Sequence, residues 1–433
     1  MALGQQDSWP LARIEAAQAK HWRRQREHVG RDSAFYRRLW NGRQPPERLA
    51  DLPELPLTSK QGLRDSQEAH PPFGDYLAQP IEAINRIHRT SGTTGRAVAM
   101  ALSERDAAIN AEAGGRSLRA CGFGPGHIAV HCLNFQMWMG GLTDHMCMEA
   151  TGAACIPFGV GASELLIHTV LGLKVTAIQC TPSYPAVLEQ VLAERFPGIA
   201  PRALGLQIGV LTGEPGLENP AFRERVEATW GFKGRNAYGL SEAWSNIAGE
   251  CDHDHAMHFV ALDLLHHELI DPDSCQPLPW RQGTVGELVL THLVKDCQPL
   301  VRFRTRDIIE LTATETCACG RTGARFRVLG RSDDMIVVRG INVFPSAVAI
   351  VLNGFPELSG EFRIVLEGRG PLDRLPIEAE LATGRIGPPR LADAIAAAIR
   401  ERTGASAAVT LVPPASLPRT EGKAKRVVRE PPA

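Results

Sequence analysis

Arg89-Thr90-Ser91-Gly92-Thr93-Thr94-Gly95-Arg96 is a polar, glycine-rich segment in which hydroxyl groups alternate with residues that free the backbone. Glycine lets the backbone turn its N–H groups toward an anion, the hydroxyls add hydrogen-bond donors, and arginine adds positive charge. These are the components of a phosphate-binding loop. A solvated Ser/Gly/Thr turn has the same composition, so the segment alone leaves both interpretations open.

The residues around this segment distinguish it from the P-loop of nucleoside triphosphatases. Gly92 and Gly95 are closer together than the glycines of G-x-x-x-x-G-K-[ST], and Ala97 follows the cation. Residues 97–102 predict a short apolar strand, whereas a P-loop leads directly into a helix. A helix is expected only after this strand, because Ser103-Glu104-Arg105-Asp106 has the spacing of a capping box. We therefore expect a phosphate loop between two strands.

Length and composition restrict the class of protein. A chain of 433 residues is too long for one ordinary core, and 44% hydrophobic with 22% charged residues is typical of a soluble globular protein. The net charge of −1 argues against nucleic-acid and anionic-membrane partners. Without a signal-peptide core, a membrane-length apolar run or any evident pairing of its ten cysteines, the chain is expected in the cytoplasm with reduced thiols.

The alternation of strands and helices predicts the fold class. Short strands are expected at 128–133, 153–158, 175–180, 207–211 and 234–237. Helices are expected between them, such as 182–196, which Thr181 would cap with Pro182 at the first helical position. This order predicts a parallel sheet covered by helices. Residues 259–312 predict an antiparallel, β-rich subdomain.

The pattern changes again after Gly330. Strands at 362–367, 377–381 and 407–412, with a helix at 390–403 closed by Gly404, predict a compact α+β module. We therefore predict an α/β protein with a large N-terminal domain and a small C-terminal domain. The N-terminal domain is expected to cover 1–330, with a helical start at 1–85, and the C-terminal domain is expected to cover 331–433.

Four further polar clusters follow the loop. Asn236-Ala237-Tyr238-Gly239-Leu240-Ser241-Glu242 comes at the end of a predicted strand, where α/β sheets bind ligands. Arg302-Phe303-Arg304-Thr305-Arg306-Asp307 places a carboxylate among cations, which suits a ribose diol or a surface ion-pair network. The third cluster covers 330–335 and 338–345, and the fourth is the tail 417–426. Taken singly, each also fits a turn or a solvated chain end.

In this order and spacing the clusters resemble the adenylate-forming superfamily of acyl-CoA synthetases, luciferases and peptide-synthetase adenylation domains. The nearest likeness is to the phenylacetate–CoA ligase branch, which is also indicated by Ser59-Lys60-Gln61-Gly62-Leu63-Arg64, Gly213-Glu214-Pro215 and Arg339-Gly340-Ile341-Asn342-Val343-Phe344-Pro345. The resemblance covers nearly the whole chain. It implies ATP- and Mg²⁺-dependent, AMP-forming activation of a carboxylic acid, followed by transfer to the thiol of CoA.

The resemblance also implies roles for individual residues. Catalytic roles fall to Lys423, which would bridge the acid carboxylate and the α-phosphate, to Glu242 as the Mg²⁺ ligand, and to Arg96 in the loop. The expected nucleotide contacts are Ser91, Gly92, Thr93, Thr94, Gly95, Gly213, Glu214, Asn236, Tyr238, Gly239, Asp307 and Arg331. Asp333 aligns with the hinge about which the C-terminal domain would swing, bringing Arg339 and Gly340 to the adenylate for thiol attack.

A cysteine- and histidine-rich constellation predicts a second metal site. Cys251 precedes His253, His255 and His258, and Cys317-Ala318-Cys319-Gly320 follows further along the chain. These donors suit a closed tetrahedral Zn²⁺ site, and some members of the branch have a similar structural zinc. We expect Zn²⁺ on Cys251, His258, Cys317 and Cys319, with His253 as the substitute for His258. The alternative is that the two downstream cysteines are free thiols on a loop.

The acid and its acceptor are less well defined. Aromatic and methionine walls with glycine floors suit a flat aromatic acid, although each residue also fits a core. The pocket is expected near Phe135, Trp138, Met139, Gly140, Gly141, Gly213, Ala237 and Trp244. Besides CoA, an amine, a carrier-protein thiol or nitrite activation stays open, and a non-catalytic adenylate-binding relative is a third class. Retention of Glu242, Asp307, Arg331 and Lys423 argues against that class. A homodimer is expected from the branch alone.

Overall fold

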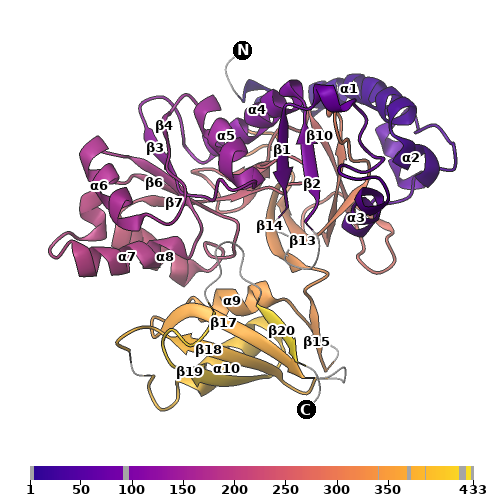
Figure 1. Cartoon of the computed structure of the whole chain (residues 1–433). Helices are drawn as coiled ribbons and strands as arrows, with labels where there is room; N and C mark the ends of the chain where they lie inside the picture. The colour runs from indigo at the N-terminus through magenta and orange to yellow at the C-terminus, as the bar shows by residue number, and fades with distance from the viewer. Residues whose placement is uncertain are drawn as a thin grey trace.

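The computed structural model describes residues 4–90, 97–339, 341–367, 372–385, 387–418 and 426–430, which form a large N-terminal part and a small C-terminal part (Figure 1). Several predicted site residues lie outside the described residues: Ser91, Gly92, Thr93, Thr94, Gly95, Arg96, Gly340 and Lys423. Among the helices that the structure describes, none combines the length and the apolar character needed to cross a membrane.

The N-terminal segment is helical, as predicted. It contains α1 (Leu11–Asp32), α2 (Ala34–Leu39) and α3 (Lys60–Ala69), which lie beside the antiparallel strands (Figure 1). Trp22 of α1, Tyr36 of α2 and Trp40, directly after α2, join the same buried cluster as Phe303 and Phe326 of the sheet. This aromatic cluster attaches the helical start of the chain to the sheet.

One twelve-stranded sheet forms the N-terminal part, and its first five strands are parallel. These are β4 (Ala154–Pro157), β3 (Ile128–His131), β5 (Ala177–Cys180), β6 (Ile208–Thr212) and β7 (Lys233–Tyr238), in spatial order. Helices cover both faces: α4 (Glu104–Ala120) and α5 (Asp144–Ala150) on one, and α6 (Ser163–Leu173), α7 (Tyr184–Arg195) and α8 (Pro220–Trp230) on the other. The predicted parallel, helix-covered sheet is confirmed.

The β-rich region continues the same sheet instead of forming a separate layer. Beyond β7 the order is β8 (Ala248–Glu250), β9 (Met257–Phe259), β14 (Arg325–Arg331), β13 (Phe303–Ala313), β12 (Val285–His292), β10 (Leu265–Ile270) and β11 (Pro277–Leu278), all antiparallel. Strand β7 makes the transition, because it pairs parallel with β6 and antiparallel with β8.

The segment before α4 also follows its prediction. The antiparallel strands β1 (Arg86–Arg89) and β2 (Ala99–Leu102) flank the predicted loop, and Ser103 and Asp106 form the capping box of α4. The expected start of the helix at Pro182 is wrong. Helix α7 begins at Tyr184 without a side-chain cap, and a second proline, Pro185, lies at the second position of its first turn, where its missing N–H leaves no intrahelical hydrogen bond unmade.

The C-terminal part has its own sheet and core. The four-stranded sheet has the order β19 (Ala407–Val412), β18 (Leu375–Leu381), β17 (Leu358–Glu367) and β20 (Val427–Glu430), with β15 (Ile336–Val338), β16 (Ile341–Val343), α9 (Pro345–Leu352) and α10 (Leu391–Thr403) beside it. The domain boundary proposed after Gly330 falls one residue before the end of β14. Ser346 Oγ donates to the Leu329 carbonyl over 2.7 Å and links the two parts.

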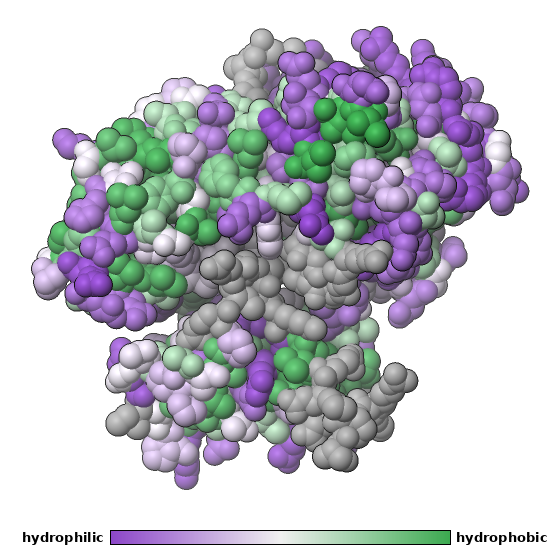
Figure 2. All heavy atoms as spheres, viewed as in Figure 1, coloured by the Kyte–Doolittle hydropathy of each residue, from purple (hydrophilic) through white to green (hydrophobic). Residues whose placement is uncertain are grey.

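The visible surface mixes hydrophilic and apolar side chains (Figure 2). Hydrophilic residues cover the N-terminal helices, at the upper right, whereas apolar residues gather over α6 and α7, at the left. Leu165 and Leu173 of α6 are 58% and 54% exposed, respectively.

Two glycines offer a test of the packing between α4 and the sheet. A methyl group at Gly249 would lie 2.4 Å from the Ser117 carbonyl oxygen, whereas one at Gly172 would enter open space in α6. We expect Gly249→Ala to lower the free energy of unfolding by about 1–3 kcal/mol through overpacking. Gly172→Ala should raise it by up to about 1 kcal/mol through helix propensity. Urea unfolding of both variants checks this, and equal losses would contradict the packing.

Candidate active site

Three predicted nucleotide contacts meet where β7, β13 and β14 lie near one another. The Tyr238 hydroxyl donates to Asp307 Oδ2 over 2.6 Å, and Arg331 Nη1 donates to Asp307 Oδ1 over 2.9 Å. Each carboxylate oxygen of Asp307 therefore has a donor that is 69 or 24 residues away in sequence. The arrangement places a carboxylate beside an aromatic ring, at the residues that were predicted to contact the ribose and the adenine.

The electrostatics keep both donors in their donating forms. Burial, reinforced by the Asp307 carboxylate, raises the pKa of Tyr238 well above its ordinary value, so the phenol stays protonated. Burial alone would lower the pKa of Arg331, but attraction to Asp307 and Asp333 raises it. Arg331 also donates from Nε and Nη2 to the two oxygens of Asp333 over 2.9 and 3.0 Å. The predicted hinge residue is thus tied to the nucleotide contacts through one guanidinium group.

The expected Mg²⁺ ligand, Glu242, has a cationic partner in this structure. The Lys60 ammonium group, at the start of α3, lies 2.7 Å from Glu242 Oε1. The Glu242 side chain is buried, whereas that of Lys60 is 32% exposed. A divalent cation at Glu242 would therefore compete with Lys60 for the same oxygen.

Two glycines shape the backbone near these groups. A side chain at Gly239 would lie 1.8 Å from the Ser245 carbonyl oxygen, so the turn after β7 requires glycine. Gly213, directly after β6, has a φ of 87°, in the left-handed region. Its neighbour Glu214 accepts from Ser183 Oγ over 2.9 Å, and burial raises the pKa of Glu214. Gly213 and Glu214 lie at the C-terminal end of β6, next to the C-terminal end of β7.

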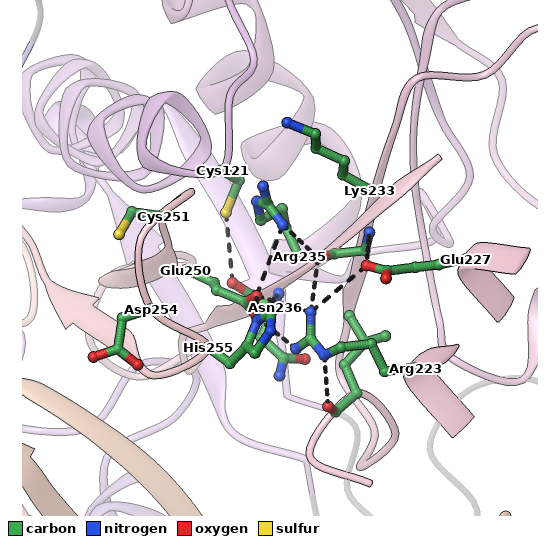
Figure 3. Close-up of polar contacts among 12 residues, drawn as sticks. Cys121, Arg223, Glu227, Lys233, Arg235, Asn236, Glu250, Cys251, Asp254 and His255 are labelled. Carbon is green, nitrogen blue, oxygen red and sulfur yellow. Dashed lines mark hydrogen bonds and ion pairs between the residues drawn. The ribbon is translucent and has the colours of Figure 1, made fainter. Parts of the chain in front are cut away.

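A buried ion network lies beside β7 and joins it to α8 and β8 (Figure 3). The Glu250 carboxylate is fully buried and accepts from Arg223 Nη1 and Nη2, each over 2.8 Å. It also accepts from the Asn236 backbone N–H over 3.1 Å and lies 2.9 Å from His255 Nδ1. Arg235 reaches the exposed carboxylate of Asp252. Sequence reasoning missed this network, and its one signal was a charged residue ending an otherwise small and apolar strand, Ala248–Glu250.

The predicted acid-pocket residues divide between a polar region and the core. Phe135 is half-buried, and its ring centroid lies 5.3 Å from that of His131 and 6.0 Å from that of His145. Met139 and Gly140 begin a π-helical turn, Met139–Thr143, directly before α5. Trp138 precedes this turn, and Ala237 is buried beneath α4 and α5.

Trp244, another expected pocket residue, lies among buried aromatic side chains. Its side chain is fully buried in the cluster that includes Trp22 and Phe303, with the Lys295 ammonium group 4.1 Å from the ring centroid. An aromatic residue two positions after Glu242 fits a core and a pocket wall equally by composition, so its place in the acid pocket stays a prediction.

The four predicted zinc ligands are brought together. One donor atom from each of Cys251, His258, Cys317 and Cys319 lies within 4.8 Å of the others. The Cys251 and Cys317 sulfurs are 3.9 Å apart, and Cys319 Sγ lies 3.5 Å from His258 Nε2. The substitute ligand, His253, contributes a backbone N–H that donates to Cys251 Sγ over 3.4 Å.

Comparison with protein families identifies both parts of the chain. Residues 56–292 match the family described as AMP-binding enzyme, and residues 340–430 match its C-terminal domain. The chain belongs to the AMP-binding enzyme family. The expected AMP-forming enzyme, with a large domain and a smaller α+β domain after it, is confirmed.

Curated relatives place the chain in the predicted branch. It is 35% identical to a phenylacetate–coenzyme A ligase of Thermus thermophilus, over 98% of each chain. It is 32% identical to a phenylacetate–coenzyme A ligase of Escherichia coli, over 96% of this chain and 94% of the relative. Membership of the phenylacetate–CoA ligase-like branch is therefore confirmed.

One solved relative also defines the conformation. A 2-hydroxyisobutyryl-CoA ligase in its post-adenylation state is 30% identical, covers 98% of this chain and 91% of the relative, and superposes with a TM-score of 0.88. The same relative in its thioesterification state and in an open conformation gives 0.71 and 0.72. Because the relative is the same protein throughout, the difference reflects conformation. The arrangement of the two parts in this chain is therefore more similar to that of the relative in its post-adenylation structure than to the other two.

The Glu250 network generates a prediction about stability. Glu250→Gln places an amide donor against the guanidinium of Arg223 and the N–H of Asn236, in a fully buried site. We expect the free energy of unfolding to fall by about 3–5 kcal/mol. Asp252→Asn is the matched control, because the Asp252 side chain is 64% exposed and its loss should cost about 1 kcal/mol or less. Denaturant unfolding would contradict the role of the network if the two variants lost equal stability.

Proposed function

We propose that this chain is an ATP-dependent ligase that joins a carboxylic acid, of aromatic type, to the thiol of CoA through an acyl-adenylate. The observation that carries the proposal is the Tyr238–Asp307–Arg331 constellation at the edge of an AMP-binding family sheet. The phenylacetate–CoA ligases among the relatives support CoA and an aromatic acid. The carboxylate oxygen would attack the α-phosphorus of ATP with loss of pyrophosphate, and the CoA thiol would then displace AMP.

The protein would act by positioning and charge neutralisation. Asp307 would accept hydrogen bonds from the ribose, and Tyr238 would border the adenine. The loop at 91–96 would bind the β- and γ-phosphates. Mg²⁺ on Glu242 would neutralise triphosphate charge. Lys423 would bridge the acid carboxylate and the α-phosphate, because a flexible point charge can follow a moving group.

The enzyme would pass from adenylate formation to thioester formation by a movement of the C-terminal domain. We propose that this domain, taken as 331–433, rotates about Asp333 and replaces Lys423 by the Arg339–Gly340 segment. Different conformations of the 2-hydroxyisobutyryl-CoA ligase support such a motion. A cytoplasmic location and a homodimer remain predictions from the sequence and the branch.

Pyrophosphate release and product mass test this function. Purified protein with ATP, Mg²⁺ and a panel of aromatic acids should release pyrophosphate, and adding CoA should yield AMP and the acyl-CoA thioester. Lys423→Ala should lower adenylate formation by at least about 100-fold, equivalent to about 2.7 kcal/mol of transition-state stabilisation. It should leave thioester formation from supplied adenylate within a few-fold of wild type. Lys425→Ala, in the same tail, is the matched control.

The outcomes separate the alternatives. Adenylate formation that survives in Lys423→Ala, with loss of the second half-reaction, would show that the lysine is misassigned. Detection of an amide, a carrier-bound thioester or a nitrite-derived product in place of acyl-CoA would show that CoA is not the acceptor. Absence of pyrophosphate release with every acid would overturn the proposal.

We further propose that Zn²⁺ occupies the cluster of Cys251, His258, Cys317 and Cys319. The donor set fits, since three thiolates and one imidazole form a closed tetrahedral site. His258 Nδ1 lies 3.2 Å from the Gly323 carbonyl, to which it must donate, and this leaves the Nε2 lone pair directed at the cluster. When bound, the ion would cross-link the residue after β8 and strand β9 with the turn before β14, a structural role.

Metal analysis tests this site. The wild-type protein should contain one Zn²⁺ per chain, and Cys319→Ser should reduce this several-fold and lower the unfolding temperature. Cys275→Ser is the matched control, because Cys275 is a partly exposed free thiol outside the cluster. A wild-type protein without zinc, or equal zinc content in both variants, would contradict the assignment.

A further inference from the structure

Helix α9 lies on the side of the C-terminal part that faces the N-terminal part (Figure 1). Near the start of this helix, the Ser346 hydroxyl donates to the Leu329 carbonyl over 2.7 Å. Near its end, Nδ2 of Asn219, which belongs to the N-terminal part, donates to the Ile350 carbonyl. The two bonds hold α9 at both ends, and the second joins residues that are 131 positions apart in the chain.

The orientation of the Asn219 amide is fixed by its own helix. Asn219 is the N-cap of α8 and is 8% exposed. Its Oδ1 accepts from the backbone N–H groups of Ala221 and Phe222 over 2.8 and 3.3 Å, so Nδ2 must face α9. The Ile350 carbonyl is one of the last four of α9, which have no N–H partner within the helix. One side chain thus caps the start of a helix in one part and the end of a helix in the other.

Apolar packing between the two parts is limited. Among the residues that the structure describes, no buried apolar cluster contains side chains from both parts, because the C-terminal core is a cluster of its own. Beside Asn219 lies an open cavity of about 350 Å³, whose other lining residues come from α9, α10 and the turn after α9. Domains joined by a small or polar interface are expected to move, so single polar contacts weigh heavily in favouring one arrangement.

The bond between Asn219 and Ile350 belongs to one arrangement of the two parts. That arrangement is more similar to the post-adenylation structure of the 2-hydroxyisobutyryl-CoA ligase than to its thioesterification structure. Asn219 stays with α8, whereas Ile350 moves with the C-terminal part. A rotation of this part, as proposed above, would therefore separate the amide from the carbonyl.

We propose that Asn219 is a positioning residue that holds the C-terminal part in the arrangement seen here and thereby sets the balance between adenylate formation and thioester formation. This inference rests on the proposed ligase function and its domain rotation. The bond favours the arrangement related to the adenylate, and it must break before the C-terminal part turns toward thioester formation. Its strength therefore opposes the passage to the second half-reaction.

Two substitutions remove the donor and keep the cap of α8. Serine and aspartate are both preferred N-cap residues, so Asn219→Ser and Asn219→Asp should retain the helix start. The serine hydroxyl ends one atom short of the amide nitrogen and cannot replace it. The aspartate carboxylate would repel the Ile350 carbonyl and the negative end of α9, so its effect should be the larger.

The distance between spin labels tests the contact directly in the full-length protein. The labels are carried by unnatural amino acids, because the chain has ten cysteines. They replace Glu194 of α7 and Ala397 of α10, both of which are exposed. In Asn219→Ser, the population at the main wild-type distance should fall about three- to tenfold relative to other distances, as expected for the loss of one hydrogen bond. Asn219→Asp should lower it further.

The half-reactions provide the second readout. The rate of thioester formation from supplied adenylate, divided by the rate of adenylate formation, should rise about three- to tenfold in Asn219→Ser. Ser33→Ala is the matched control, because it removes the N-cap of α2, in the N-terminal helical segment. It should lower stability and leave both the label distances and the ratio of rates as in wild type.

The outcomes separate this proposal from the ligase function. The same distribution of label distances in wild type and in both Asn219 variants would overturn the proposal, whatever their activity. An equal loss of both half-reactions in Asn219→Ser would also overturn it, since a merely structural role predicts that result. Absence of pyrophosphate release with every acid would instead overturn the ligase function, and the label distances would still decide whether Asn219 holds the two parts together.

Discussion

Strand β7 is the element on which the rest of the site depends. It pairs parallel with β6 and antiparallel with β8, so it joins the two halves of the sheet at one line of hydrogen bonds. Its last residue, Tyr238, reaches Asp307, and the glycine after it has no space for a side chain. Packing around Gly239 therefore fixes the direction in which the chain leaves β7. Glu242 follows Gly239 by three residues, so the same packing helps to position it.

A buried carboxylate holds this strand in register. Glu250 replaces part of the β7–β8 ladder by accepting from the Asn236 N–H with its side chain, while Arg223 supplies the compensating charge. A buried ion pair is costly unless every oxygen is bonded, and here both oxygens are. Cys251 follows directly, so the strand that supports the predicted nucleotide contacts leads straight into the Cys/His cluster. One continuous stretch of backbone, β8 and the residue after it, therefore supports β7 and also carries the first member of the proposed metal site.

Local patterns predicted the local elements, and long-range pairing had to come from the structure. The five parallel strands and the capping box at Ser103 follow from apolar periodicity and cap chemistry within a few residues. The Lys60 partner of Glu242 depends on how the N-terminal helices pack on the sheet, which periodicity does not encode. Trp244 lies among buried aromatic side chains, an environment that an aromatic residue fits as well as it fits a pocket wall. The proximity of Cys251, His258, Cys317 and Cys319 was predicted because cysteine spacing is specific even across long loops.

Arg331 lies between the two domains and pairs with three carboxylates, those of Asp307, Asp333 and Asp334, which differ in their exposure to water. Arg331 bonds Asp307, whose side chain is 11% exposed, and also Asp333, whose side chain is 46% exposed. An ion pair open to water contributes little, about 1 kcal/mol or less, whereas a more buried one is screened less. Rotation at Asp333, as proposed for the C-terminal domain, would break the weaker pair and leave the Asp307 pair in place. The nucleotide contacts would then persist through the exchange of half-reactions, because the same guanidinium that releases the hinge still holds the ribose acceptor.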